Sequence, residues 1–311
     1  AEAPPAVVLN ATGFAVSPPG AERRATPFDG AGCPVLQVVF AGGNEEGWRA
    51  GAHGLSARDI AMNVALPEVD GRILARAVSF KGRAERDPLT ETDIVTYRPV
   101  ADRVAFACEL AANWTRLAET PVAERRVALV LANYPNRDGR MGNGVGLDVP
   151  AATVRVLAAL GLAGYAVDGA PADGAELIAR LAAGPTNDLA ALPERTVSES
   201  LPLADYAAWF DALPEVVRDR VGERWGAPEK DPHFMSGKDR GGGAFAIPAF
   251  RCGRVAVALQ PARGYNIDPK ASYHDPDLPP PHGYLAFYAW LRGHFRAHAV
   301  VHMGKHGNLE W

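Results

Sequence analysis

Residues 127–150 read VALVLANYPNRDGRMGNGVGLDVP, and this stretch is the most informative one for the fold. Its first eight residues are mostly apolar and rich in β-branched side chains, which is typical of a strand buried on both faces. A glycine-rich loop follows over residues 135–148. Asp148 and Pro150 then supply the N-cap and the first-turn proline of a helix. A buried strand that leads through a loop into a helix predicts a βαβ unit and a parallel sheet.

The chain after this stretch continues to alternate between strand and helix signals. Asp173 and Glu176 have the spacing of a capping box, and Gly184-Pro185 ends the helix that they begin. The other predicted strands are residues 165–167, 255–259 and 299–302, and the other predicted helices are residues 204–210, 214–224 and 283–296.

The chain before this stretch is richer in strands. Short apolar runs predict strands at residues 7–9, 35–40, 78–80 and 94–97. Apolar residues at three- and four-residue steps predict a helix over residues 104–117. The expected fold class is therefore α/β, with strands alternating with helices, mostly parallel sheets and at least two subdomains. We expect these to be a strand-rich segment, 1–125, and a segment with the glycine-rich loop and a histidine-rich end, 126–311.

Composition excludes several classes of function. Hydrophobic residues make up 48% and charged residues 22% of the chain, and the net charge of −4 offers no basic footprint for nucleic acid. No apolar run approaches the roughly 20 residues of a membrane span, and the first residues lack a signal peptide's features. Three separated cysteines without CxxC spacing argue against a disulfide framework. We expect a cytoplasmic protein.

Histidines gather near the end of the chain, where six of the eight lie between His274 and His306. His302 and His306 follow a predicted strand and are separated by glycine, and Glu310 lies one helical turn further on. Two imidazoles and a carboxylate are a plausible ligand set for a divalent transition metal. The alternative is a glycine-rich turn whose histidines cap backbone groups. The pattern is not HExxH, because Glu follows neither histidine.

Two further loops carry polar side chains directly after predicted strands. The glycine-rich loop fails both nucleotide fingerprints, since it holds neither a P-loop lysine nor G-x-G-x-x-G. Its glycines are equally compatible with a tight turn. The loop of residues 260–270 has the default interpretation of a solvated loop. The donors suited to carboxylate or amide groups in the two loops are Arg137, Arg140, Asn143, Arg263, Tyr265, Asn266 and Lys270.

Together these stretches resemble a known family, the large subunits of aerobic cobaltochelatase and, more distantly, of magnesium chelatase. The resemblance runs along nearly the whole chain. Asn136-Arg137-Asp138-Gly139 and Gly304-Lys305-His306-Gly307 are closer to the cobalt branch. The other matching motifs are Gly54-Leu55-Ser56, Met62-Asn63-Val64, Leu66-Pro67-Glu68, Asp70-Gly71-Arg72, residues 134–148, residues 260–270, Pro280-Pro281-His282-Gly283-Tyr284 and residues 302–311.

The resemblance implies a subunit that binds a tetrapyrrole and a metal. The substrate would be hydrogenobyrinic acid a,c-diamide, the inserted metal Co²⁺, and the pathway that of cobalamin. ATP and Mg²⁺ would be used by separate AAA-type ATPase subunits and not bound by this chain. Aromatic residues with Arg, Lys and Asn donors suit a flat ring with a rim of carboxylates and amides. The resemblance adds His274 and Lys305 to the substrate-binding residues named above.

A mechanism follows as a hypothesis. A histidine or Glu310 would accept the protons of the inner ring nitrogens, and His302 and His306 would hand over the metal. Members of the family are several times longer, so we expect a fragment that is inactive alone. Other functions stay open: a magnesium chelatase subunit acting on protoporphyrin IX, a non-catalytic metal or tetrapyrrole carrier, and a metal-dependent hydrolase built on the same His and Glu residues.

Overall fold

The computed structural model describes residues 4–133, 138–237, 242–265 and 277–304, without the side chains of residues 83–85. The chain divides into two compact units, Ala1–Thr120 and Pro121–Trp311, which are described separately. The division falls slightly before residue 126 because the short helix Val122–Glu124 lies close to Gly164 of the second unit. No helix in the described ranges has the length and hydrophobicity needed to cross a membrane.

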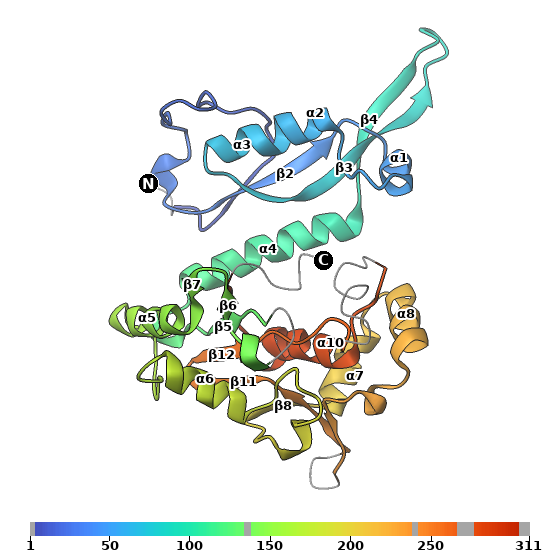
Figure 1. The fold of residues 1–311 in the computed structure, drawn as a ribbon. Helices are drawn as coiled ribbons and strands as arrows, with labels where there is room; N and C mark the ends of the chain where they lie inside the picture. Colours follow the sequence, from blue (N-terminus) through green and yellow to red (C-terminus); the bar gives the residue numbers. More distant parts are fainter. Residues whose placement is uncertain (1–3, 134–137, 238–241, 266–276, 305–311) are drawn as a thin grey trace. The chain divides into compact units, whose positions relative to one another are not determined.

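The N-terminal unit is built on a four-stranded sheet of order β1-β2-β3-β4 (Figure 1). Its first three strands are parallel, and β4 returns antiparallel to β3. All four predicted strands are confirmed, and β3 is much longer than residues 78–80. The bounds are Val8–Asn10 for β1, Val35–Ala41 for β2, Ile73–Arg86 for β3 and Asp93–Pro99 for β4.

Helices cover both faces of this sheet. On one face Val39, Ala77 and Phe80 pack against Trp48, Leu55 and Val64, and on the other Val38 and Val78 pack against the predicted helix α4. The chain between β2 and β3 is helical, which the sequence did not predict. The bounds are Asp29–Ala31 for a 3-10 turn, Glu45–Ala50 for α1, Ala57–Ile60 for α2, Ala61–Ala65 for a π turn, Leu66–Val69 for α3 and Ala101–Glu119 for α4.

The C-terminal unit contains the sheet predicted from residues 127–150. Its order is β11-β12-β5-β13, with β12 and β13 parallel to the fully buried β5 and β11 antiparallel at one edge. The parallel prediction is therefore confirmed for the three strands that matter below. The bounds are Val127–Leu131 for β5, Ala249–Cys252 for β11, Val255–Leu259 for β12 and Ala299–Met303 for β13.

Two hydrophobic cores enclose this sheet. Leu129, Leu131 and Val257 pack with helices α5 and α6, whereas Ala128 and Val130 pack with α10. The predicted caps are confirmed, because Asp148 accepts a hydrogen bond from the Ala151 amide and Asp173 from the Glu176 amide. The bounds are Val149–Leu162 for α5, Gly174–Ala183 for α6, and His282–Ala289 for α10, which continues as a π turn over Trp290–His294.

Smaller elements complete the unit. The predicted strand at residues 165–167 is wrong: this extended segment lies beyond the sheet, where the Ala166 carbonyl accepts a hydrogen bond from the Arg254 amide at 2.8 Å. A small antiparallel sheet has the order β8-β10-β9. The bounds are Asn143–Gly144 for β6, Leu147–Asp148 for β7, Glu199–Pro202 for β8, Leu203–Asp211 for α7, Glu215–Trp225 for α8, Phe234–Met235 for β9 and Ala244–Ile247 for β10, with 3-10 turns at Asp138–Arg140, Leu192–Glu194 and Pro228–Lys230.

Candidate functional site

The three loops singled out in the sequence leave one edge of one sheet. Leu131 at the end of β5 lies opposite Leu259 of β12 and Met303 of β13. The loop backbones remain joined beyond the strands, because the Gln260 amide donates to the Leu131 carbonyl and the Ala132 amide donates to the Met303 carbonyl, both at 3.0 Å. Ligands of parallel sheets bind at this carboxyl edge. The edge of β12, β5 and β13 is therefore the candidate site.

His302 lies on β13 at this edge. It pairs with Val130, so its side chain points to the α10 face of the sheet, and it is exposed. The other predicted metal ligands, His306 and Glu310, lie outside the described residues, as does Lys305. Within the described ranges, no three His, Cys, Asp or Glu side chains come together as a metal site. The three-ligand site stays a prediction.

Gly304 explains how β13 approaches β5 so closely. Its φ is +147°, and a Cβ added to it would lie 2.8 Å from the Cβ of Ala132. Only glycine adopts this conformation without strain, and only glycine leaves room for Ala132. The glycine therefore fixes the path of the chain directly after His302.

Asn133 is a site residue that the sequence analysis missed. Its side chain follows β5 at the candidate edge, is 1% exposed, and has no hydrogen-bond partner for either amide atom. An unpaired buried amide costs about 1–3 kcal/mol. The only sequence signal was a polar residue at the end of an apolar run, which normally marks the end of a strand. Such an amide can both donate to and accept from a ligand at this edge.

The glycine-rich loop is held by an ion pair between Arg195 and Asp138, at 2.7 Å. Of the predicted ligand-binding residues in this loop, Arg140 is exposed and Asn143 is half-buried in the β6–β7 hairpin, whereas Arg137 lies outside the described residues. Only part of the predicted donor set can therefore be placed at the edge.

The third loop is buried where the sequence predicted a solvated one. Asn187, distant in sequence, donates to the Gln260 carbonyl at 3.0 Å and accepts from the Ala262 amide at 2.8 Å, so the backbone needs no water. Arg263 is also buried, and its guanidinium donates to the Leu278 carbonyl at 3.2 Å while Nη1 has no partner. Asn266, Lys270 and His274 lie outside the described residues.

Tyr265 turns inward to a buried carboxylate, Asp231. The phenol donates to Asp231, which also accepts from the Gly283 amide at 2.7 Å and the His233 amide at 2.9 Å. Burial opposes ionisation of Asp231, but the hydrogen bonds and the charge of His233 hold its pKa below the ordinary value. Burial, reinforced by the Asp231 charge, raises the pKa of Tyr265. Tyr265 is thus an anchor of its loop, and no pattern in the sequence indicated Asp231.

Other histidines of the cluster have structural partners. The His282 ring is buried, with Nε2 2.9 Å from the Gly226 carbonyl and Nδ1 2.6 Å from the Tyr206 hydroxyl. Because a carbonyl only accepts, Nε2 carries the proton, and neutral His282 accepts from Tyr206. His298 Nδ1 accepts from the Arg126 amide at 2.9 Å. His282 and His298 therefore hold elements together, and His302 is the exposed histidine at the edge.

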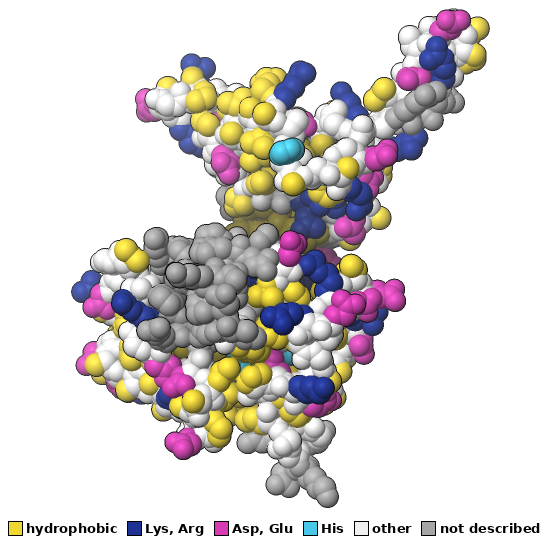
Figure 2. Space-filling model, turned by 45° about the vertical axis from the view of Figure 1, so that its right-hand side comes forward, with side chains coloured by type: hydrophobic (Ala, Val, Ile, Leu, Met, Phe, Trp, Pro, Cys, Tyr) yellow, Lys and Arg dark blue, Asp and Glu magenta, His cyan; other side chains and the backbone are white. Residues whose placement is uncertain are grey.

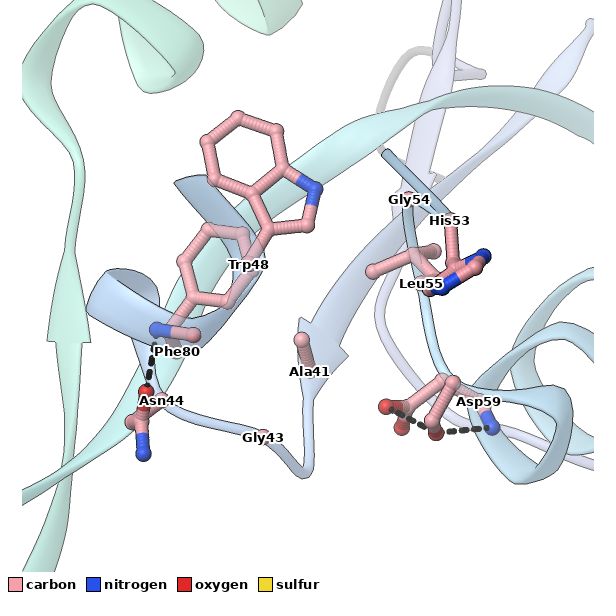
Figure 3. Close-up of a pocket in the computed structure, with 11 residues that line it drawn as sticks. Ala41, Gly43, Asn44, Trp48, His53, Gly54, Leu55, Asp59 and Phe80 are labelled. Carbon is pink, nitrogen blue, oxygen red and sulfur yellow. Dashed lines mark hydrogen bonds between the residues drawn. The ribbon is translucent and has the colours of Figure 1, made fainter. Parts of the chain in front are cut away.

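The N-terminal unit has hollows of its own, beside the turn that follows β2. One of about 320 Å³ lies between Trp48 and Phe80 on one side and His53 and Leu55 on the other (Figure 3). The ring centroids of Trp48 and Phe80 are 4.9 Å apart. On the face shown in Figure 2, hydrophobic side chains of this unit mix with Lys and Arg side chains.

Comparison with known proteins is consistent along the whole chain. The family model described as CobN/Magnesium Chelatase matches residues 1–311. Aerobic cobaltochelatase subunit CobN of Sinorhizobium sp is 59% identical over 100% of this chain and 24% of that relative, and its namesake from Pseudomonas aeruginosa is 53% identical over 98% and 24%. A magnesium-chelatase subunit of Rhodobacter capsulatus is 30% identical over 85% and 22%.

A solved structure has the same fold. The catalytic subunit of cobaltochelatase from Mycobacterium tuberculosis superposes with a TM-score of 0.82 at 35% identity, covering 98% of this chain and 26% of that one. The chain thus spans about a quarter of the length of the relatives that it matches.

Proposed function

The chain belongs to the CobN/magnesium chelatase family, and from this premise we propose that it forms the ring-holding part of a cobaltochelatase large subunit. The reaction is the insertion of Co²⁺ into hydrogenobyrinic acid a,c-diamide, on the route to cobalamin. The observation that carries the proposal is the convergence of three family motifs at the carboxyl edge of β12, β5 and β13. Unrelated loops would have no reason to meet there.

The cobalt branch is favoured over the magnesium branch by sequence identity. Two cobaltochelatase subunits are 59% and 53% identical to this chain, against 30% for a magnesium-chelatase subunit of similar coverage. The substrate metal is therefore cobalt, and the substrate ring a corrin precursor with carboxylates and amides on its rim.

The edge offers groups that suit such a rim. Asn133 supplies a donor and an acceptor with no partner in the described structure, and Arg263 supplies an unpartnered guanidinium nitrogen. An amide or carboxylate that pairs with these groups would remove their burial cost, so binding gains more than one ordinary hydrogen bond. We propose Arg140, Asn143 and Tyr265 as neighbours that shape the site, and Arg137, Asn266, Lys270, His274 and Lys305 as further ligands of the rim.

Insertion replaces the inner N–H protons of the ring with a cation, so a base has to accept them. Exposed His302 is suited to that step or to delivery of the metal, since imidazole titrates near neutral pH and ligates transition metals. His306 and Glu310 complete the proposed set, and the three residues share the two roles.

Energy for insertion comes, in this proposal, from AAA-type partner subunits in the cytoplasm that use ATP and Mg²⁺. The chain itself carries no P-loop lysine after its glycine-rich turn. Its role is to hold ring and metal, while the partners change its conformation.

A titration of the chain with hydrogenobyrinic acid a,c-diamide tests the proposal, with protoporphyrin IX as the competing ring. We expect Asn133→Leu to weaken binding of the corrin precursor at least tenfold, while its thermal stability is unchanged or raised because an unpaired buried amide is removed. Arg155→Met, an exposed change on α5, is the control. Unchanged ring affinity in Asn133→Leu, or tighter binding of protoporphyrin IX by the parental chain, would refute the proposed site or the cobalt branch respectively.

A further inference from the structure

A second hollow in the N-terminal unit, of about 540 Å³, is separate from the candidate edge. It lies beside Gly42 and Gly43, directly after β2, and so at the carboxyl end of a parallel strand. Its volume falls within the range of about 300–1,000 Å³ that is usual for small-molecule sites. Neither the proposed chemistry nor the family motifs of the C-terminal unit make use of it.

Three exposed aromatic rings line this hollow. Phe14, Phe40 and Tyr97 are 60%, 43% and 47% exposed, and the rings of Phe40 and Tyr97 lie 5.7 Å apart. Single exposed apolar side chains are ordinary on protein surfaces, but a group of aromatic rings around one hollow marks a binding surface. Rings offered edge and face in this way suit a planar partner that can stack on them.

Two cations flank the same hollow. Lys81 Nζ lies 5.5 Å from the centre of the Tyr97 ring, and Arg58 lines the hollow from α2. Neither forms an ion pair with any residue in the described ranges. The positive charge of the hollow is therefore left for a ligand.

One carboxylate, Asp59, also touches the hollow, but it is engaged in holding the wall. Its oxygens accept from the Gly42 amide at 3.0 Å, the Ser56 hydroxyl at 2.8 Å and Asn63 Nδ2 at 3.3 Å. Figure 3 shows Asp59 from the neighbouring hollow, with its hydrogen bond to Ser56. Gly43 has no atom within 4 Å of an added Cβ, so its backbone faces open space that a ligand can enter.

We propose that this hollow binds a planar aromatic anion, with its ring against Phe40 and Tyr97 and its acidic group between Arg58 and Lys81. The site goes beyond the proposed chelatase function and does not depend on it. Two sources share this chemistry, a tetrapyrrole carboxylate and a nucleotide, and the test separates them.

The test compares two fluorescent probes on the 311-residue chain. One is 8-anilinonaphthalene-1-sulfonate, and the other is N-phenyl-1-naphthylamine, which has the same rings without the charge. We expect Arg58→Met and Lys81→Met each to weaken binding of the sulfonate on the order of tenfold and to leave the neutral probe unchanged. Arg24→Met removes an exposed cation outside the hollow and is the matched control. Sulfonate affinity that is the same in all three variants would overturn the proposal.

Displacement of the sulfonate then identifies the source. Deuteroporphyrin IX represents the tetrapyrrole carboxylates and AMP the nucleotides. Displacement by either one that is lost in Lys81→Met supports the site and names its ligand class. If neither competes at millimolar concentration, the hollow does not serve as an aromatic-anion site.

Discussion

Replacing Gly304 with alanine should disturb the candidate edge in a way that a second substitution partly repairs. The added Cβ would lie 2.8 Å from the Ala132 Cβ, closer than two carbon atoms approach in folded proteins, and φ is +147°. The backbone conformation alone costs an L-residue about 1–3 kcal/mol, and the overpacking another 1–3 kcal/mol. We therefore expect a loss of about 4 kcal/mol for Gly304→Ala.

The magnitude can be measured as a double-mutant cycle. Ala132→Gly removes the atom that the new Cβ would strike, so Ala132→Gly/Gly304→Ala should recover the overpacking cost but not the backbone cost. In a unit of this size, 4 kcal/mol corresponds to a fall in Tm of about 8–16 °C. Thermal unfolding of the parental chain, both single variants and the double variant gives the coupling energy.

Two outcomes would contradict this expectation. A Gly304→Ala variant with an unchanged Tm would mean that β13 and β5 do not approach as described. A cycle without coupling would mean that Ala132 is not the obstacle. Either outcome would remove the basis for placing the chain after His302 at this edge.

Three further predictions concern the buried carboxylate, the glycine-rich loop and nucleotide binding. Asp231→Asn should cost about 3 kcal/mol at pH 7, because Tyr265 and the Gly283 amide lose their acceptor. Since folding lowers the pKa of Asp231, its contribution is complete above the unfolded value of about 4 and fades as the pH falls through the folded value; a stability difference that stays constant down to pH 3 in urea unfolding would contradict this. Gly144→Val should destabilise by about 1–3 kcal/mol, because its Cβ would meet the Leu147 carbonyl at 2.7 Å, whereas Met141→Leu should cost less than about 1.5 kcal/mol; equal Tm values for the two would argue against the hairpin. Calorimetry should detect no micromolar affinity for ATP, and a measured one would mean that the fingerprints were misjudged.

The parallel sheet could be predicted from the sequence because its signals are local. Residues 127–134 carry the uniform apolar run of a strand buried on both faces, and Asp148 caps the next helix through a bond only three residues long. Once three parallel strands are known, the meeting of their loops follows from geometry. The site could therefore be located, though not furnished, from the sequence.

Other features depend on contacts between distant segments. Residues 260–264 are polar enough to suggest solvent, but Asn187 satisfies their backbone from elsewhere in the chain. Asp231 meets Tyr265 and Gly283 only after folding, and no spacing announces it. The short helices of residues 45–69 lack the long apolar stripe that predicts a helix. The expected φ > 0 of Gly144 was also wrong: its neighbours Gly142 and Gly146 have positive φ, and Gly144 is needed for space.

The proposal as a whole depends on the carboxyl edge of β12, β5 and β13 holding the ring. A cryo-electron microscopy map of the full-length subunit with hydrogenobyrinic acid a,c-diamide bound would show where the ring lies. We expect ring density within contact distance of Asn133, His302 and Gly304. Ring density that lies away from this edge, with Asn133 still unpaired, would show that the ring is held elsewhere.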